Sequence, residues 1–202
     1  MRIASLSVPC RCHVCAFFSS RDEEYDILLP FLQEGLAEGD RVVQIIDGDH
    51  RPDQMKRLER WGMDVAPATE AGQFEVWNWE DAYLRGGRFA QFSMISLLEE
   101  VGSLGERRGS GATRLWANME WALEEFPGVH DIVEYETRLN YVLPRFEMMT
   151  VCTYDLNKFS ASVVVDILRT HPQAIIGGVF FQNPTYVPPD EFLREYMTRQ
   201  RK

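Results

Sequence analysis

Short hydrophobic runs alternate with longer amphipathic stretches along most of this chain. The runs lie at 13–18, 41–47, 74–79, 113–121, 148–155 and 174–180, and their lengths, with many β-branched and aromatic residues, are typical of buried strands. Between them, apolar residues recur at helical spacing at 20–39, 52–62, 88–103, 129–143 and 158–169. We therefore expect an α/β protein with a three-layer architecture, in which helices cover both faces of a mostly parallel sheet.

The first helix has the clearest boundaries. Ser20 and Glu23 form the Ser-x-x-Glu pattern of a capping box at its start, and Gly39 is a natural stop at its end. Pro30 lies inside this helix, where we expect it to introduce a kink or to remove one backbone hydrogen bond.

Length and composition indicate an ordinary globular protein. The 202 residues suffice for one domain over residues 1–202, with a core at about 13–181 and a final amphipathic helix at 189–200. The net charge of -10 argues against direct nucleic-acid binding, which requires a basic surface. No apolar run predicts a membrane span, and the first residues make a poor secretory signal. Cys10, Cys12 and Cys15 crowd near the N-terminus, which makes a poor disulfide scaffold and favours a reducing cytoplasm.

Several motifs resemble those of a known sensory family. The stretch HVCAFFSSRDEEYDILLPFLQEGLAEGDRVVQIID is followed by LWANMEWAL, IVEYETRLN, VCTYDLNKFSASVVVDILRTHP and NPTYVPP. In this order and spacing they resemble the MEDS domain, a sensory domain of methanogen and methylotroph regulators, from about His13 to about Phe192. The resemblance implies a RecA/KaiC-like fold and a signal-receiving role.

The segment between the first strand and the first helix departs from a working RecA-like protein. A phosphate-binding loop needs the pattern G-x-x-x-x-G-K-[ST] at this point. Residues 18–24 read FSSRDEE, with no glycine, no lysine and three acids at Asp22, Glu23 and Glu24. Because acids repel phosphate, we expect no ATP binding or hydrolysis, and no enzymatic activity is predicted.

The N-terminal cysteines are candidates for metal binding. Thiolates and imidazole are good ligands for zinc and softer metals, so Cys12, His13 and Cys15 form a candidate set. In a strand, His13 and Cys15 would share one face, which Cys152 of another strand could approach. Two alternatives stay open: the cysteines are ordinary core residues, or a thiol pair senses redox conditions.

A ligand pocket is expected beyond the carboxyl ends of the strands, where ligands of such sheets bind. The candidate lining residues are His13, Trp116, Glu120, Glu136, Cys152 and Tyr154. Each also has a structural interpretation: the aromatic residues can be plain core, and Glu136 can pair with Arg114 or Arg138. His171 is interpreted as the end of a helix before Pro172.

The resulting hypothesis is a cytoplasmic sensory domain that binds a small molecule or a metal-held cofactor. It would pass the signal to a partner, such as a kinase, an anti-sigma factor or a transcription regulator, through the helix at 189–200. One alternative is a degenerate nucleotide-binding or metal-dependent hydrolase that uses Asp47, Asp49 and Glu120. Another is a pure protein-interaction module. A homo-oligomer is open, because RecA relatives often form rings.

Overall fold

The computed structural model describes residues 2–3, 6–7, 11–108 and 111–200. Its centre is a seven-stranded sheet with the strand order β5-β4-β6-β7-β3-β8-β9. Every neighbouring pair is parallel except β8 and β9, which confirms the expected mostly parallel sheet. The strands are β3 (Cys12–Phe18), β4 (Arg41–Ile46), β5 (Phe74–Asn78), β6 (Thr113–Asn118), β7 (Met148–Asp155), β8 (Gln173–Ile176) and β9 (Val179–Gln182).

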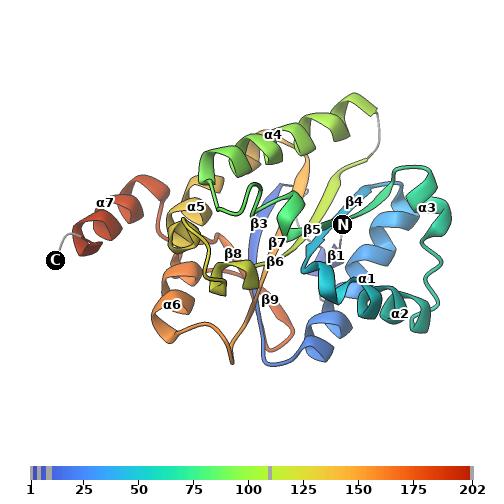
Figure 1. Cartoon of the computed structure of the whole chain (residues 1–202), viewed down its shortest axis with the longest axis horizontal. Coiled ribbons are helices and arrows are strands. Elements are labelled where there is room, and N and C mark those ends of the chain that lie inside the picture. Colours follow the sequence, from blue (N-terminus) through green and yellow to red (C-terminus); the bar gives the residue numbers. More distant parts are fainter. Residues whose placement is uncertain (1, 4–5, 8–10, 109–110, 201–202) are drawn as a thin grey trace.

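Helices cover both faces of this sheet, so the three-layer architecture is as expected (Figure 1). One face carries α1 (Arg21–Glu38), α2 (Arg51–Arg60) and α3 (Ala66–Glu70). The other carries α4 (Gln91–Arg108), α5 (Ile132–Leu139), α6 (Ala161–Thr170) and α7 (Pro189–Gln200). Single 3-10 turns lie at η1 (Gly48–His50), η2 (Trp79–Asp81), η3 (Glu120–Leu123), η4 (Val129–Asp131) and η5 (Leu143–Arg145). A short antiparallel pair, β1 (Arg2–Ile3) and β2 (Leu6–Ser7), lies apart from the main sheet.

The strands alternate between two separate hydrophobic cores. In β3, Cys15 and Phe17 pack under the layer of α4 to α7, while Val14 and Ala16 pack under α1 to α3. Successive side chains of a strand point to opposite faces, so a strand buried on both sides reads as a continuous apolar run. This explains why the periodicity along the chain could identify strands but could not show which neighbours they have.

The first helix follows its sequence signals closely. The hydroxyl of Ser20 accepts a hydrogen bond from the backbone N–H of Glu23, and the Glu23 carboxylate accepts one from the backbone N–H of Ser19. Gly39 ends the helix with a φ of 80°. Pro30 lies within the helix, which is continuous from Arg21 to Glu38.

Two predicted elements differ from the structure. The run at 174–180 is a hairpin: β8 and β9 are antiparallel neighbours joined by Gly177 and Gly178, whose φ values are 56° and 72°. Two consecutive residues with positive φ are typical of a type I′ turn, which glycine makes without strain. The predicted helix at 129–143 is interrupted, because only Ile132–Leu139 is α-helical and 3-10 turns lie on either side.

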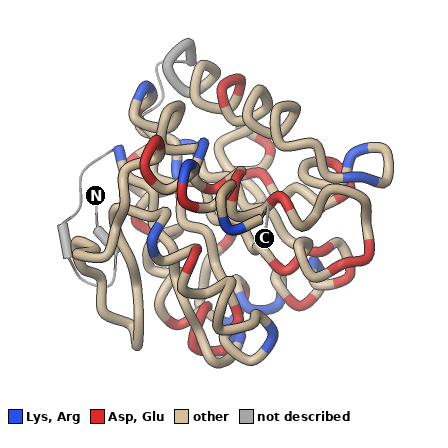
Figure 2. The backbone as a smooth tube through the Cα atoms, turned by 90° about the vertical axis from the view of Figure 1, so that its left-hand side faces the viewer, with Lys and Arg blue, Asp and Glu red and all other residues tan. Residues whose placement is uncertain are grey.

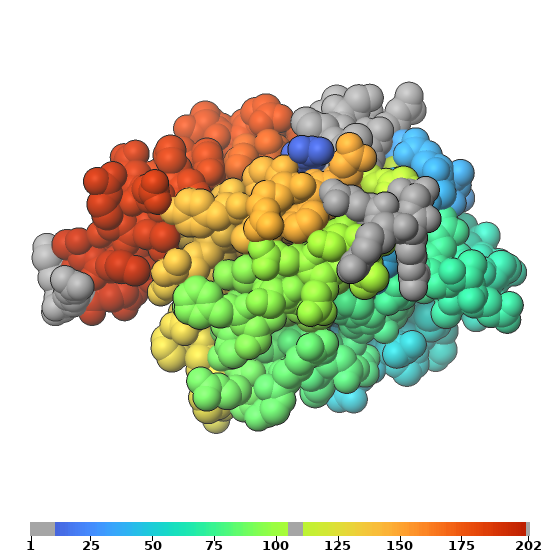
Figure 3. All heavy atoms as spheres, turned by 90° about the horizontal axis from the view of Figure 1, so that it is seen from above, coloured from blue at the N-terminus to red at the C-terminus, as the bar shows by residue number. Residues whose placement is uncertain are grey.

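The C-terminal helix α7 is docked onto α5 and α6 at one end of the molecule (Figures 1 and 3). Phe192 is fully buried, and ion pairs join Arg169 to Glu195 and Arg199 to Asp166. Acidic and basic residues are mixed along the side of the molecule seen in Figure 2. Of the helices that the structure describes, none has the length and hydrophobicity needed to cross a lipid bilayer.

The docking of α7 depends on one aromatic anchor. We expect Phe192→Ala to lower the free energy of unfolding by about 3 kcal/mol, because it removes a fully buried phenyl ring. Met197, which is 41% exposed on the same helix, provides the control, and Met197→Ala should change stability by less than about 0.5 kcal/mol. Urea denaturation of both variants measures the difference. Equal effects would show that Phe192 does not anchor the helix.

Candidate functional site

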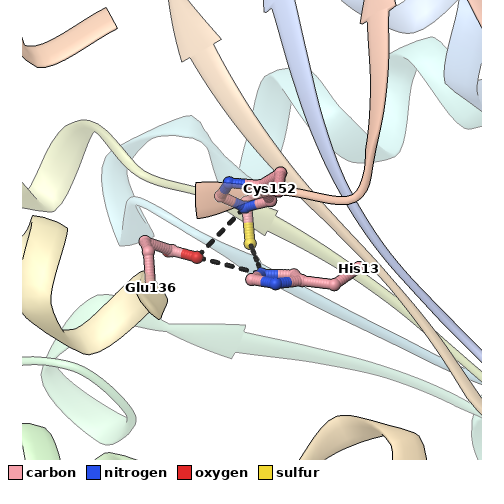
Figure 4. A group of neighbouring side chains, drawn as sticks. His13, Glu136 and Cys152 are labelled. Carbon is pink, nitrogen blue, oxygen red and sulfur yellow. Dashed lines mark hydrogen bonds and ion pairs between the residues drawn. The ribbon is translucent and has the colours of Figure 1, made fainter. Parts of the chain in front are cut away.

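Four buried side chains that can bind a metal converge under α5 and α6. They are His13 of β3, Cys152 of β7, Glu136 of α5 and His171, which follows α6 directly. One ligand atom of each residue lies within 4.8 Å of those of the others. Among the described residues, no other three histidine, cysteine or acidic side chains form such a group. Figure 4 shows His13, Glu136 and Cys152 pointing toward one another.

The sheet register brings these residues together. Strand β3 lies between β7 and β8, with Cys15 opposite Cys152 and His13 opposite Thr150. Odd-numbered positions of β3 and even-numbered positions of β7 therefore face the same helical layer. Helix α5 presents Glu136 to this face, and the chain leaves α6 at His171 to enter β8. The site thus depends on three strands and two helices being packed as they are.

The Glu136 carboxylate is at the centre of the site. Its Oε2 lies 3.0 Å from Nε2 of His13 and 3.2 Å from Nε2 of His171, and Sγ of Cys152 lies 3.8 Å from Nε2 of His13. None of the four side chains is more than 3% exposed. Burial alone would raise the pKa of Glu136, but the neighbouring His13 and His171 lower it to about 2, so the carboxylate is ionised.

The other ring nitrogen of each histidine has a fixed partner. Nδ1 of His171 lies 2.8 Å from the carbonyl oxygen of Ile167, which can only accept, so Nδ1 carries the hydrogen. The side-chain nitrogen of Asn140 donates to the backbone carbonyls of Glu136, Thr137 and Thr170. Its Oδ1 is therefore the atom that accepts a hydrogen bond from Nδ1 of His13, at 3.2 Å. In a neutral imidazole the second nitrogen is then a lone pair. Each Nε2 faces the Glu136 carboxylate, as an N–H donor when the ring is protonated and as a lone pair when it is neutral.

The ionised Glu136 carboxylate has little positive charge beside it. Burial and the nearby His13 lower the pKa of His171, which favours its neutral form, and its ring centroid lies only 3.9 Å from that of His13. Nε2 of His171 and Oε1 of Glu136 have no hydrogen-bond partner among the described residues. An unsatisfied buried polar atom costs on the order of 1–3 kcal/mol. A metal ion could bind all four groups.

At the carboxyl edge of the sheet, where a ligand pocket is expected, the space enclosed directly by the strand ends is small. Strands β3, β6 and β7 end around a cavity of about 30 Å³, which holds roughly one or two water molecules. The carboxylate of Glu24 lies in its wall, where Oε1 accepts hydrogen bonds from Nε1 of Trp116 at 2.9 Å and from Oγ1 of Thr153 at 2.6 Å. Glu120, at the same edge, forms an ion pair with Lys158.

The six predicted ligand residues therefore divide among three places. His13, Glu136 and Cys152 meet in the buried site. Tyr154 lies on the same face, with its ring centroid 6.4 Å from that of His171. Trp116 lies on the opposite face and Glu120 at the carboxyl edge.

The predicted metal set of Cys12, His13 and Cys15 is not the one that the fold brings together. Cys12 points into the core on the opposite face of β3. Cys15 shares the face of His13, but its Sγ lies 3.7 Å from the carbonyl oxygen of Gln173 and outside the metal-binding group. Cys10 lies outside the described residues.

The predicted arginine partners of Glu136 are also wrong. Arg114 binds Glu34, Glu38 and Asp40 on the other face, and Arg138 binds Glu134. Glu136 instead lies against His13 and His171, and of these two histidines the sequence did not indicate His171 as a site residue. In the sequence, His171 is fully explained as the residue that ends a helix before Pro172. Only the pairing of β8 with β3 shows that its side chain also reaches the buried site.

The residues of the hydrolase alternative do not meet. Asp47 accepts a hydrogen bond from the backbone N–H of Asp49 and lies 3.1 Å from His50, which makes it a turn-stabilising residue after β4. Glu120 is paired with Lys158 after β6. Within the part of the chain that the structure describes, these three acids do not form a metal-binding group.

The fold places the chain in the class of three-layer RecA-like α/β proteins. It is similar to a KaiC-like protein of the archaeon Pyrococcus horikoshii, with a TM-score of 0.60 over 85% of this chain and 73% of that chain. The two sequences are 15% identical, so this likeness concerns the fold alone.

Residues 12–172 match the family described as MEDS, the methanogen/methylotroph, DcmR sensory domain, and the chain belongs to this family. It is also similar to the transcriptional repressor DcmR of Methylorubrum extorquens, with 28% identity over 171 residues. The similarity covers 84% of this chain but 62% of the repressor, so the chain spans less than two thirds of that relative. Family membership supports a sensory and regulatory role.

The buried Glu24 predicts a specific pH dependence of stability. Burial raises the pKa of Glu24, although the hydrogen bonds from Thr153 and Trp116 oppose the increase. Between the unfolded and folded pKa values the folded state binds more protons, so this residue lowers stability as the pH rises through that window. We expect Glu24→Gln, which cannot ionise, to gain stability relative to the wild type as the pH rises from the ordinary carboxyl range toward neutrality.

Denaturation curves at several pH values test this prediction. Glu59, which is exposed on α2, provides the control, and Glu59→Gln should follow the wild-type pH dependence. A constant difference between Glu24→Gln and the wild type would show that Glu24 ionises in the folded protein as readily as in the unfolded chain.

Proposed function

We propose that this chain is a non-hydrolytic sensory domain that receives its signal at the site of His13, Glu136, Cys152 and His171. The observation that carries the proposal is the convergence of these four buried side chains, two of whose polar atoms have no hydrogen-bond partner among the described residues. A group that neutralises and satisfies them would bind strongly. Family membership supports a sensory role, and these four side chains are the place in the fold where we propose that the signal acts.

Two features of the carboxyl edge of the sheet support the proposal that this domain does not bind or hydrolyse nucleotides. The turn between β3 and α1 has neither the glycines that expose backbone N–H groups nor the lysine of a phosphate-binding loop. The Glu24 carboxylate lies beside it, and the adjoining cavity is far too small for a triphosphate. We infer that this edge stabilises the fold and does not bind ATP.

The packing of the helices suggests how a signal leaves the site. Glu136 belongs to α5 and His171 ends α6, and α7 packs against both of these helices. A change at the four side chains would therefore alter the surface on which α7 is docked. We propose that a partner transcription regulator recognises α7, or the surface that it covers, and that the domain acts in the cytoplasm.

The proposal makes a direct prediction about nucleotides. Ligands that bind only the folded state raise the melting temperature, and a concentration of 100 times Kd adds about 2.7 kcal/mol. We expect millimolar ATP with Mg²⁺ to leave the melting temperature unchanged and to release no phosphate. A shift accompanied by turnover that Glu120→Gln abolishes would favour the hydrolase alternative instead.

Hydrogen exchange can test the connection between the site and α7. Glu136→Gln removes the central charge on the face that carries α5, α6 and α7, and we expect faster amide exchange in α7 relative to the central strands. Glu24→Gln is the matched control, because Glu24 is also a buried glutamate but lies under the opposite helical layer. It should leave exchange in α7 unchanged. The connection is wrong if both variants affect α7 alike, or if neither does.

A further inference from the structure

We propose that His13, Glu136, Cys152 and His171 bind one divalent transition-metal ion, and that zinc fits the site best. This inference rests on the proposed function, because it names the class of ligand that the same site takes. The sequence suggested a metal at Cys12, His13 and Cys15, and the structure replaces that set with residues from four separate segments of the chain.

The distances match a tetrahedral ion. Bonds of about 2.0–2.1 Å to nitrogen or oxygen and about 2.3 Å to sulfur imply ligand atoms roughly 3.3–3.8 Å apart. Nε2 of His13 lies 3.0 Å from Oε2 of Glu136 and 3.8 Å from Sγ of Cys152, and Nε2 of His171 lies 3.2 Å from the same Oε2. All four atoms are within 4.8 Å of one another, so small side-chain movements suffice to complete the geometry.

The charges also match a divalent ion. Two neutral imidazoles, one carboxylate and one thiolate carry two negative charges in a volume closed to solvent. A divalent ion balances them and turns the lone pairs that face each other into ligands. Binding releases the proton of the Cys152 thiol, together with any proton shared between His13 and Glu136. Hard ions such as Mg²⁺ and Ca²⁺ prefer oxygen, so the nitrogen and sulfur donors favour a transition metal.

The surroundings have the features of a built metal site. Histidines that bind metals normally donate their other N–H to a carbonyl or carboxylate, which fixes the ring and its tautomer. His171 donates to the Ile167 carbonyl and His13 donates to the Asn140 side chain. A cavity of about 80 Å³ lies beside His13 and Asn140, next to the site, and is also lined by the exposed Arg11.

Cobalt substitution tests the assignment on the full chain. Protein freed of metal by a chelator is titrated with Co²⁺ under reducing, oxygen-free conditions. We expect one Co²⁺ per chain, the visible bands of a tetrahedral ion and the near-ultraviolet charge-transfer band of a cobalt–thiolate bond. Zn²⁺ should displace the cobalt and bleach these bands, and it should raise the melting temperature.

Cysteine variants identify the sulfur ligand. Cys152→Ser should abolish the charge-transfer band, whereas Cys15→Ser, which changes the facing residue of the neighbouring strand, should keep it. The removal of an outer partner typically weakens metal binding about 10–100-fold, and we expect a loss of this size for Asn140→Ala. Circular dichroism establishes which variants are folded, and His171→Ala provides a second ligand variant if Cys152→Ser does not fold.

The outcomes separate this inference from the proposed function. A folded wild type that binds no Co²⁺ or Zn²⁺, or a thiolate band that survives Cys152→Ser and disappears in Cys15→Ser, overturns the metal assignment. The response of α7 to Glu136→Gln would still support the sensory site. Stoichiometric metal binding without any response of α7 would leave the metal site standing and contradict the proposed path of the signal.

Discussion

The buried carboxylate of Glu136 is the constraint on which this half of the molecule depends. An ionised group without exposed surface costs far more than the few kcal/mol by which a domain is stable, unless a positive charge accompanies it. The groups that can supply or bind that charge come from β3, β7 and the end of α6. The order of the strands and the packing of α5 and α6 are therefore coupled to one electrostatic requirement.

Another buried glutamate, Glu24 of α1, shows a different solution to the same problem. Glu24 lies on the opposite face, where an indole N–H and a hydroxyl donate to it and burial raises its pKa. Hydrogen bonds and a raised pKa accompany its burial there. Glu136 instead faces two imidazole nitrogens and has a lowered pKa, so it stays charged. Under the proposed metal assignment, the second arrangement is the one that takes a cation, and the two faces differ in chemistry for that reason.

The sequence was sufficient for most of the elements and for part of the site, because both follow from local periodicity. Alternation in the strand at 13–18 places His13 and Cys15 on one face, which Cys152 of another strand could approach. The order of the strands in the sheet could not be predicted from the sequence, because continuous apolar runs do not specify which strands pair. His171 was therefore missed, since its role appears only when β8 pairs with β3. The hairpin at Gly177 and Gly178 was missed because its two strands together form one apolar run.

The buried site lies on one face of the sheet and not at its carboxyl edge, and this position bears on the proposed path of the signal. In open α/β sheets, ligands usually bind at the carboxyl ends of the strands, where loops respond to them. Here that edge is filled by Glu24 and its partners, and the reactive groups lie beneath helices. A packed interface responds by shifting between discrete arrangements, because close-packed side chains leave little room for gradual adjustment. Under the proposed function, a charge change below α5 and α6 would be absorbed by these helices and by α7, which is docked on them.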